Sequence, residues 1–423
     1  MPTATKPFTK TEKQREAIAL LKSPARHILL YGGARSAKTF ILLYAIAKRA
    51  VRAKSRHLIL RQHFNHVKTS VWLDTLPKMF DLAFRDDDGD QMPFRRNDSD
   101  FYLRFENGSE IWIGGLDEKE RSDKILGTEF STIFFNECSQ LTYESVETAR
   151  SRLAEKSELV NRCYYDCNPP HKAHWAHRQF IEKVDPKEKT PLPSPERYAS
   201  MLMNPIDNLE NIDPEFMEEL NGMSKRKRDR FMLGLWQDDD DRALWQYDDI
   251  LRAVVAPEMD RIVVAIDPAV TVSDQADETG IIVAGKCGNR FYVLEDLSGK
   301  YTPKGWANKA VFAYHHWHAD RIIGEVNNGG DMIENTIRQV NKNVSYKEVR
   351  ATRGKVLRAE PVAALYEQHR GYHVGSFPEL EDQMTTPIEE LEDDDRLDAM
   401  VWAATELMLG VEIASDAEFI EME

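Results

Sequence analysis

The stretch His27–Thr39, which reads HILLYGGARSAKT, decides the fold of the first half of this chain. An apolar run leads into two glycines, and Lys38 and Thr39 follow at the spacing of a phosphate-binding loop. The backbone N–H groups of such a loop point at phosphates, the lysine reaches the β- and γ-phosphates, and the threonine hydroxyl holds Mg²⁺. Ala37 stands where a second glycine is usual. We predict an ATP site here; the alternative is a glycine turn that precedes Lys-Thr by chance.

A second apolar run, Ser131–Glu137 (STIFFNE), has the pattern of the strand that carries the Walker-B carboxylates. Asn136 stands where the Mg²⁺-linked aspartate of the usual Asp-Glu pair is expected, and it carries no charge. Glu137 remains, and we predict that it polarises the attacking water. The alternative for Glu137 is an ordinary acid at the end of a strand.

Length and composition indicate a soluble protein of two or three domains. The chain has 423 residues, 42% of them hydrophobic, and no apolar run approaches the roughly 18 residues of a membrane span. The N-terminus lacks the apolar segment of a secretory signal. The spacing of the four cysteines indicates neither a zinc site nor a disulfide framework, so we expect reduced thiols in a cytoplasm.

The charge distribution matters more than the net charge of −15. No acidic residue occurs between Glu16 and Asp74, and further basic clusters occupy Lys225–Arg230 and Arg350–Arg358. Such clusters fit either solvated helix faces or a partner with a phosphate backbone.

The second half of the chain carries a separate pattern. Arg261–Asp267 (RIVVAID) reads as a strand that ends in an acid, and two more strands and a helix-strand alternation follow. This order is the RNase H-like arrangement. Asp267 on the first strand, Glu325 on the fourth and Asp398 near the start of the last helix converge in that fold. Grouped carboxylates suit Mg²⁺ or Mn²⁺, and two such ions activate water for phosphodiester cleavage.

Each of these carboxylates also has a plainer interpretation. Asp267 before Pro268 suits a turn, Glu325 an ion pair, and Asp398 the first turn of a helix. Secondary candidates for metal assistance are Asp277, Asp331 and Asp395. The run His315–His318 has the composition of a metal site, but consecutive helical positions point in different directions, so we expect core and surface roles for it.

Taken together, the motifs resemble the large terminase subunit of tailed double-stranded DNA bacteriophages. Thr11–Ile18 resembles the adenine-contacting segment of that family, with Gln14 as the reader, and GGARSAKT resembles its relaxed phosphate loop. Leu58–Val71 resembles the strand and arginine segment that follows the first helix of that family, and Gly115–Gly127 resembles the segment that leads into the Walker-B strand. Cys167–Pro170 (CNPP) resembles the coupling motif, with Asn168 as its polar group. The resemblance implies that the nucleotide is bound by Gln14, Gly32, Gly33, Ala34, Arg35, Ser36, Ala37, Lys38 and Thr39.

For the fold, the resemblance implies an α/β protein with an N-terminal P-loop ATPase domain of the RecA/ASCE type, a small linker subdomain and a C-terminal RNase H-like nuclease domain. The expected divisions are residues 1–180 for the ATPase core, 181–250 for the linker subdomain and hinge, and 251–423 for the nuclease domain with its acidic tail. Pro214–Trp236 resembles the linker of the family.

For function, the resemblance implies ATP-driven translocation of viral double-stranded DNA into procapsids and endonucleolytic cutting of concatemeric DNA. Catalytic roles then fall to Lys38, Glu137, Asp267, Glu325 and Asp398. The expected cofactors are ATP, Mg²⁺ with the nucleotide, held by Thr39, and Mg²⁺ or Mn²⁺ held by Asp267, Glu325 and Asp398.

The expected partners are double-stranded DNA, the small terminase subunit and the portal protein of the procapsid. We expect a homo-oligomeric ring, a pentamer, when the protein is docked, and a monomer when it is free. Such motors complete the ATP site with a neighbour's arginine, for which Arg121 is the first candidate and Arg61 the second. The expected location is the host cytoplasm, with transient docking on the portal and no membrane contact.

Two other interpretations remain open at this point. A helicase-nuclease of DNA repair needs the motifs of a second RecA-like motor domain, whereas this chain continues from one ATPase core to the nuclease pattern. A catalytically silent, nucleotide-switched capsid adaptor fits Asn136 but not the intact Lys38 and Glu137, nor the three acids of the nuclease pattern.

Overall fold

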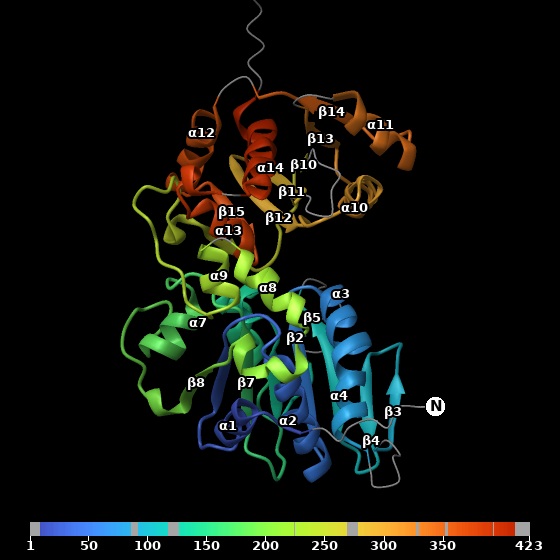
Figure 1. Ribbon diagram of the computed structural model, residues 1–423, viewed down its shortest axis with the longest axis vertical. Helices are drawn as coiled ribbons and strands as arrows, with labels where there is room; N and C mark the ends of the chain where they lie inside the picture. The colour runs from blue at the N-terminus through green and yellow to red at the C-terminus, as the bar shows by residue number, and fades with distance from the viewer. Residues whose placement is uncertain are drawn as a thin grey trace, which may run out of the picture. The chain divides into compact units, whose positions relative to one another are not determined.

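The computed structural model describes residues 9–410, apart from 86–91, 117–126, 224, 269–277, 327–329, 352–353 and 392. The chain forms two compact units, Met1–Asp238 and Asp239–Glu423, and each is described by itself (Figure 1). The boundary falls at the start of the acidic run Asp238–Asp241. Within the described residues, no helix combines the length and the apolar character that crossing a membrane requires.

The first unit is built on an eight-stranded sheet in the order β3-β4-β5-β2-β6-β7-β1-β8. From β5 to β8 all neighbouring strands are parallel, and β3 and β4 add an antiparallel edge. The strands are β1 (His27–Tyr31), β2 (Arg56–Arg61), β3 (Phe94–Asn97), β4 (Tyr102–Phe105), β5 (Glu110–Gly115), β6 (Thr132–Phe135), β7 (Arg162–Cys167) and β8 (Tyr198–Leu202). The carboxyl ends of the parallel strands meet at one edge, where α/β sheets bind their ligands.

Helices cover this sheet and connect its strands (Figure 1). They are α1 (Glu12–Leu21), α2 (Lys38–Arg52), α3 (Phe64–Val67), α4 (Leu76–Ala83), α6 (Tyr143–Arg150), α7 (Trp175–His177), α8 (Pro214–Gly222) and α9 (Lys225–Phe231), with π-helical turns at Lys68–Thr75 and Arg178–Glu182. Thr11 begins α1 with a capping box, in which its hydroxyl accepts from the backbone N–H of Gln14. In α2, Ile41, Leu42 and Ile46 are buried and contribute to the core beneath the sheet.

The second unit contains a seven-stranded sheet in the order β14-β13-β10-β11-β12-β15-β9. Antiparallel β10-β11-β12 are followed by strands that join in parallel, as the RNase H-like pattern predicts. The strands are β9 (Leu251–Ala253), β10 (Arg261–Asp267), β11 (Gly280–Cys287), β12 (Arg290–Asp296), β13 (Arg321–Glu325), β14 (Tyr346–Val349) and β15 (Gly371–Val374). The helices are α10 (Pro303–His316), α11 (Gly330–Val340), α12 (Lys355–Glu367), α13 (Pro378–Met384) and α14 (Asp395–Ala404).

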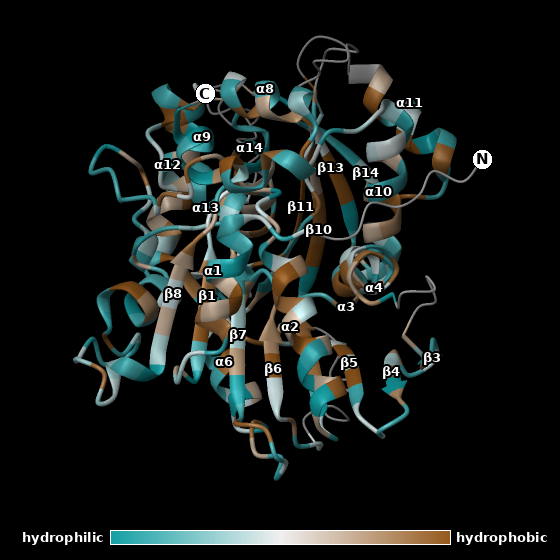
Figure 2. Ribbon diagram, turned by 60° about the horizontal axis from the view of Figure 1, so that its bottom comes forward, coloured by the Kyte–Doolittle hydropathy of each residue, from teal (hydrophilic) through white to brown (hydrophobic). Residues whose placement is uncertain are grey.

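Hydrophobic residues concentrate on the strands, for example on β10 and β13, as Figure 2 shows. The helix predicted over Arg396–Leu409 is α14, followed by a π-helical turn at Thr405–Leu409. This helix packs tightly on β11, because a Cβ atom at Gly280 would lie 1.9 Å from the backbone oxygen of Asp395. Glycine is therefore required at position 280 to seat α14 on the sheet.

The sequence predicts three parts, divided at residues 180 and 250, whereas the structure separates two units. The three-part division stays a prediction. Strand β8, within the range assigned to the linker, pairs with β1 in the first sheet. Helices α8 and α9 occupy the segments EFMEEL and KRKRDR of the predicted linker.

Candidate functional site

The phosphate-binding loop connects β1 to α2 at the carboxyl edge of the first sheet. Ala37 has φ +65° and Arg35 has φ +55°, so both adopt the left-handed backbone that favours glycine. A Cβ atom at Gly32 would lie 2.0 Å from the backbone oxygen of Met203, so glycine is required there. The loop thus keeps its shape at Ala37 at some cost in backbone strain.

Lys38 is buried under this loop. Its Nζ donates to the backbone oxygens of Gly32 (3.0 Å) and Gly33 (2.6 Å), to Oγ of Ser36 (3.0 Å) and to Oδ1 of Asn168 (3.2 Å). Burial lowers the pKa of Lys38, while the nearby carboxylates of Glu137 and Asp166 act in the opposite direction. The predicted phosphate-binding lysine and the predicted coupling residue are therefore in direct contact.

Thr39 lies beside a carboxylate that the sequence analysis missed. Its hydroxyl donates to Oδ2 of Asp166 at 2.5 Å, and Nδ2 of Asn136 donates to both oxygens of the same carboxylate, at 3.0 and 3.2 Å. Burial and the neighbouring carboxylate of Glu137 raise the pKa of Asp166. Asp166 stands within CYYDC on β7, where no apolar periodicity or motif distinguishes it.

Glu137 follows β6 in a left-handed conformation, with φ +50°, and its backbone N–H donates to Oδ1 of Asp166 at 2.7 Å. A non-glycine residue in this conformation is held there by its surroundings, and such residues cluster at functional sites. Glu137 also lines the cavity beside the loop, where a water-polarising residue is needed.

The cavity beside the loop has a volume of about 1230 Å³. Its walls include Gln14, Lys38, Glu137, Asn168, Asn208 and Phe216. Nε2 of Gln14 donates to Oδ1 of Asn208 at 3.3 Å, and Nδ2 of Asn208 donates to the backbone oxygen of Arg35 at 2.8 Å. The guanidinium of Arg35 lies 5.9 Å from the ring centre of Phe216.

The predicted linker also holds the base of the loop. The backbone N–H of Gly33 donates to Oδ1 of Asn204 at 2.9 Å, and that of Ala34 donates to the backbone oxygen of Phe231 at 2.7 Å. These contacts join residues far apart in the sequence, so no local pattern signals them. The backbone N–H groups of Gly33 and Ala34 are therefore already hydrogen-bonded within the protein.

Of the two candidate arginine fingers, Arg61 lies within the described residues. Arg121 lies outside the described residues. Arg61 ends β2, where its Nη1 donates to Oγ of Ser70 at 2.9 Å and its Nε to Oε1 of Gln140 at 3.4 Å.

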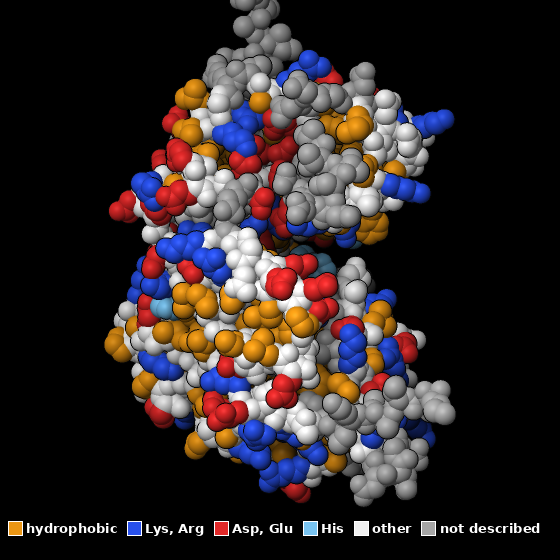
Figure 3. Space-filling model, viewed as in Figure 1, with side chains coloured by type: hydrophobic (Ala, Val, Ile, Leu, Met, Phe, Trp, Pro, Cys, Tyr) orange, Lys and Arg blue, Asp and Glu red, His pale blue; other side chains and the backbone are white. Residues whose placement is uncertain are grey.

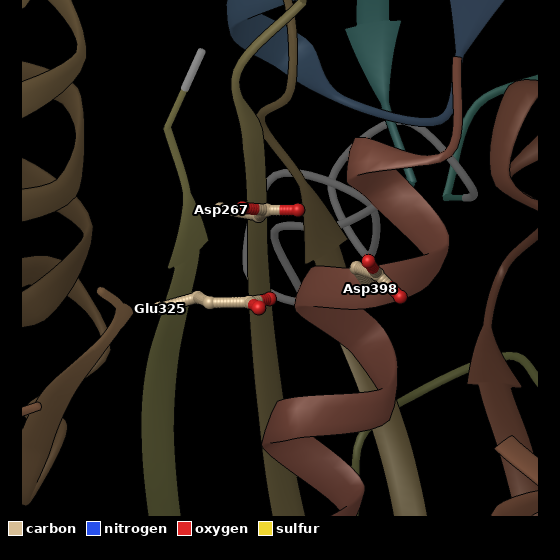
Figure 4. Close-up of side chains that lie close together, drawn as sticks. All are labelled: Asp267, Glu325 and Asp398. Carbon is tan, nitrogen blue, oxygen red and sulfur yellow. The ribbon is translucent and has the colours of Figure 1, made fainter. Parts of the chain in front are cut away.

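In the second unit, Asp267, Glu325 and Asp398 come together from β10, β13 and α14. Each offers an oxygen, and the three oxygens lie within 4.8 Å of one another, the only such group of possible metal ligands among the described residues. Their side chains extend into a common space (Figure 4). Acidic side chains gather beside Lys and Arg side chains on this face of the unit (Figure 3). The oxygen-only donor set fits Mg²⁺ or Mn²⁺.

Electrostatics at this group match those of an ion site. Burial, together with the carboxylates of Glu325 and Asp398, raises the pKa of Asp267 to about 9. Burial also raises the pKa of Asp398, against the nearby cations Lys355 and Arg358. Crowded carboxylates that resist ionisation in the absence of a cation are typical of metal centres.

Two cations on α12 contact these carboxylates. Nη1 of Arg358 lies 3.4 Å from Glu325 and its Nη2 lies 3.5 Å from Asp398, while Nζ of Lys355 lies 3.3 Å from Asp398. Nε1 of Trp402 donates to the other oxygen of Glu325 at 2.6 Å. The basic cluster Arg350–Arg358 in the sequence signals the two cations, but not their contact with the acids.

Of the three secondary candidates for metal assistance in the nuclease, Asp395 lies within the described residues. Asp395 begins α14, one turn before Asp398, and contributes to the raised pKa of Asp267. Asp277 and the side chain of Asp331 lie outside the described residues. His315 pairs with Asn341 at 2.9 Å, and no histidine of the run His315–His318 belongs to a group of metal ligands within the described part of the chain.

Two family models match the chain. The model for the phage terminase large subunit matches residues 24–225, and the model for the terminase RNase H-like domain matches residues 264–407. Together they span most of the chain and both of its units. Neither supports a helicase-nuclease or an adaptor.

Solved structures of similar proteins include the large terminase from a thermophilic bacteriophage, with 15% identity and a TM-score of 0.48, covering 95% of this chain and 99% of that chain. The HK97 bacteriophage large terminase is 11% identical, with a TM-score of 0.41, over 95% of this chain and 96% of that chain. The large terminase nuclease from thermophilic phage G20c is 12% identical, with a TM-score of 0.31, over 39% of this chain and 98% of that chain. Comparison with curated proteins gave no match.

The two family models and the two units agree on the organisation of the chain. Such a protein uses a nucleotide and divalent metal, acts in the host cell, and has DNA and the packaging machinery as partners. The chain belongs to the phage terminase large subunits, with an ATPase that drives DNA packaging and an RNase H-like nuclease that cuts the DNA.

Proposed function

We propose that Lys38, Thr39 and Glu137 carry out ATP hydrolysis in the first unit. Lys38 exchanges its contacts with the loop carbonyls for the β- and γ-phosphates of ATP, and Glu137 polarises the attacking water from the end of β6. Mg²⁺ bound with the nucleotide through Thr39 neutralises the phosphate charge. The burial of Lys38 and its place beside Glu137 at one cavity support these roles.

Gln14 lines the same cavity and orients the adenine. Its Oε1 accepts from the backbone N–H of Thr11 at 3.2 Å, and its Nε2 donates to Asn208. The side chain is therefore preoriented, and Asn208 connects it to the backbone of Arg35 in the loop. Adenine and phosphate recognition share one hydrogen-bonded network in this proposal.

Asn168 couples hydrolysis to movement. It accepts a hydrogen bond from Lys38 and stands at the end of β7, so a change at the phosphates reaches this strand through one contact. The CNPP segment continues from it towards the linker.

The nuclease reaction belongs to Asp267, Glu325 and Asp398, and their convergence from three separate elements is the observation that carries this assignment. These three carboxylates would hold Mg²⁺ or Mn²⁺, which would supply the activation of water and the stabilisation of the leaving 3′-oxygen of the phosphodiester. In the protein without metal, Lys355 and Arg358 neutralise the acids. Once the acids are occupied, these two cations contact the phosphates of the DNA backbone.

The resemblance to the terminase family also supports specific protein partners. They are the small terminase subunit and the portal protein, on which the chain forms a pentameric ring while remaining monomeric when free. A neighbour's arginine, Arg121 or else Arg61, completes the ATP site in the ring. The protein works in the host cytoplasm and docks on the portal transiently.

One assay tests both activities. The purified chain is incubated with plasmid, ATP and Mg²⁺ or Mn²⁺, and DNA cleavage and phosphate release are followed together. Asp267→Asn is expected to lose DNA cleavage and keep ATPase activity. Lys38→Ala is expected to lose ATPase activity and keep DNA cleavage. Normal cleavage by Asp267→Asn in Mn²⁺ contradicts the carboxylate site, and phosphate release by Lys38→Ala contradicts the ATP site.

A further inference from the structure

We propose that Asp166 is the carboxylate that anchors the nucleotide-bound Mg²⁺ of the ATP site, in place of the Walker-B aspartate that Asn136 replaces. The inference rests on the proposed nucleotide role of the loop that ends in Lys38 and Thr39. It adds a residue from a third segment of the chain, outside both the loop and the Walker-B strand.

The strand order brings Asp166 to the right place. Strand β7 lies between β6 and β1, and it is parallel to both. Tyr165 pairs with Phe135 on β6, so Asp166 and Asn136 are the next residues on the two neighbouring strands. On the other side Asp166 pairs with Leu30, two residues before the loop begins at Gly32. Asp166 thus lies between the Walker-B position and the phosphate-binding loop.

The hydrogen bond from Thr39 supports a role at the cation. Because the hydroxyl donates its proton to Asp166 at 2.5 Å, the lone pairs of the same oxygen remain available to a metal ion. Asp166 is 1% exposed and holds the hydroxyl in this orientation. The oxygen of Thr39 is thus placed to bind Mg²⁺, while Asp166, whose two oxygens accept from Thr39, Asn136 and Glu137, supplies its negative charge beside the ion.

Charge balance explains why position 136 is an asparagine. Its Nδ2 lies 3.0 and 3.2 Å from the two oxygens of Asp166, so an aspartate there would place two carboxylates in contact. Two carboxylates at that distance do not both ionise without a cation between them. Asn136 instead donates to Asp166 and stabilises its charged form.

The other side of the Asn136 amide points to a further ligand. Its Oδ1 is buried and has no hydrogen-bond partner among the described atoms. A buried acceptor without a partner is costly, and a water molecule of the metal's hydration shell would satisfy it. The pair Asn136 and Asp166 therefore supplies one charge and one free acceptor at the place where a Walker-B aspartate supplies both.

A purely structural Asp166, which only locks Thr39 and Glu137 in place, is the competing explanation. The two differ in what the charge does. An anchor for Mg²⁺ contributes only to binding of the metal-nucleotide complex, whereas a structural lock affects nucleotide binding with and without metal.

The experiment measures binding of a fluorescent non-hydrolysable ATP analogue to the full chain, once in Mg²⁺ and once in EDTA. The variants are Asp166→Asn, Asn136→Asp and the exchange variant Asn136→Asp/Asp166→Asn. Glu110→Gln is the matched control, because Glu110 is also a buried carboxylate of this unit but pairs with Arg104 away from the loop. Thermal unfolding of each variant checks that it folds.

In Asp166→Asn we expect the Mg²⁺-dependent gain in affinity to fall at least tenfold, with the affinity in EDTA unchanged. The exchange variant regains most of that gain, because it restores one carboxylate, and Glu110→Gln keeps all of it. Equal losses in Mg²⁺ and EDTA, an unchanged Asp166→Asn, or a folded exchange variant without recovery each overturn the proposal. If the wild-type chain binds no analogue under either condition, the proposed ATP site itself fails.

Discussion

Lys38 donates a hydrogen bond to Asn168, so the lysine that we propose to bind phosphate contacts the CNPP segment directly. The same lysine has three other acceptors in the loop, and removal of Asn168 therefore leaves it held. The contact joins the loop to the end of β7 without passing through the nucleotide.

Asn168→Ala is expected to separate ATP turnover from movement of DNA. Nucleotide affinity and ATPase rate stay within about fivefold of the wild type, since Lys38 keeps its three other acceptors and the loss of one hydrogen bond costs on the order of 1 kcal/mol. DNA packaging into procapsids falls much further, because hydrolysis no longer reaches β7. The measurement is the amount of DNA packaged per ATP hydrolysed, with packaging and phosphate release followed in the same reaction. If the variant packages as much DNA per ATP as the wild type, Asn168 has no role in coupling.

Glu137→Gln is expected to bind ATP normally and to stop turnover, because an amide cannot polarise water as a carboxylate does. The substitution keeps the shape of the side chain and leaves the backbone contact with Asp166 in place. Single-turnover phosphate release with a nucleotide-binding control tests it. Steady-state release close to the wild-type rate assigns the base role to another group.

Ala37→Gly is expected to stabilise the first unit. Ala37 has φ +65°, and releasing a left-handed non-glycine residue gains about 1 kcal/mol, less the entropy that glycine adds to the unfolded chain. Ala47→Gly, in the interior of α2, is the control and loses about 1 kcal/mol or more. Urea denaturation measures the change in the free energy of unfolding of each variant. Destabilisation by Ala37→Gly contradicts backbone strain at the loop.

Metal binding to the nuclease centre is expected to strengthen as the pH rises from 6 to 8. Asp267, whose pKa is raised to about 9, carries a proton in the metal-free protein and must release it to bind a cation. Glu325, Asp398 and Asp395 favour the protonated form of Asp267, and Lys355 opposes it.

Calorimetry of Mn²⁺ binding in two buffers of different ionisation enthalpy measures this proton release. Asp267→Asn abolishes the release together with most of the affinity, and Glu110→Gln in the first unit leaves both unchanged. Affinity that is independent of pH over this range contradicts the protonated state of Asp267.

Gly280→Ala is expected to disable the nuclease without touching the ATPase. The added methyl group meets the backbone oxygen of Asp395 and displaces α14, which carries Asp398. Overpacking of this kind costs typically 1–3 kcal/mol. Gly222→Ala, where a Cβ atom meets nothing within 4 Å, is the control. Plasmid cleavage and thermal unfolding report the outcome, and wild-type cleavage by Gly280→Ala contradicts the close packing.

The parts of the fold that the sequence predicts are those with a local signal. The predicted strand Arg261–Asp267 matches β10 residue for residue. Its mainly β-branched residues favour a strand, and the acid followed by Pro268 determines where that strand ends. Asp267 closes this run, Glu325 lies near the end of the fourth predicted strand, and Asp398 lies near the start of an amphipathic helix, so their positions follow from the elements that carry them.

What escaped prediction depends on contacts between distant segments. Asp166 gains its surroundings from β6 and α2, and a lone acid between tyrosine and cysteine shows none of this. Asn208 meets Gln14 across nearly two hundred positions of sequence, and Lys355 is drawn to Asp398 by an electrostatic attraction that no periodic pattern records.

The pairing of Asn136 with Asp166 changes how such chains are compared with one another. A survey that inspects only the end of the Walker-B strand would score this protein as lacking its metal-linked acid and class the motor as inactive. The physical requirement is for one negative charge shared by two neighbouring strand ends, and either strand can supply it. Among relatives we expect the two positions to vary together, with an aspartate at one accompanied by a neutral side chain at the other.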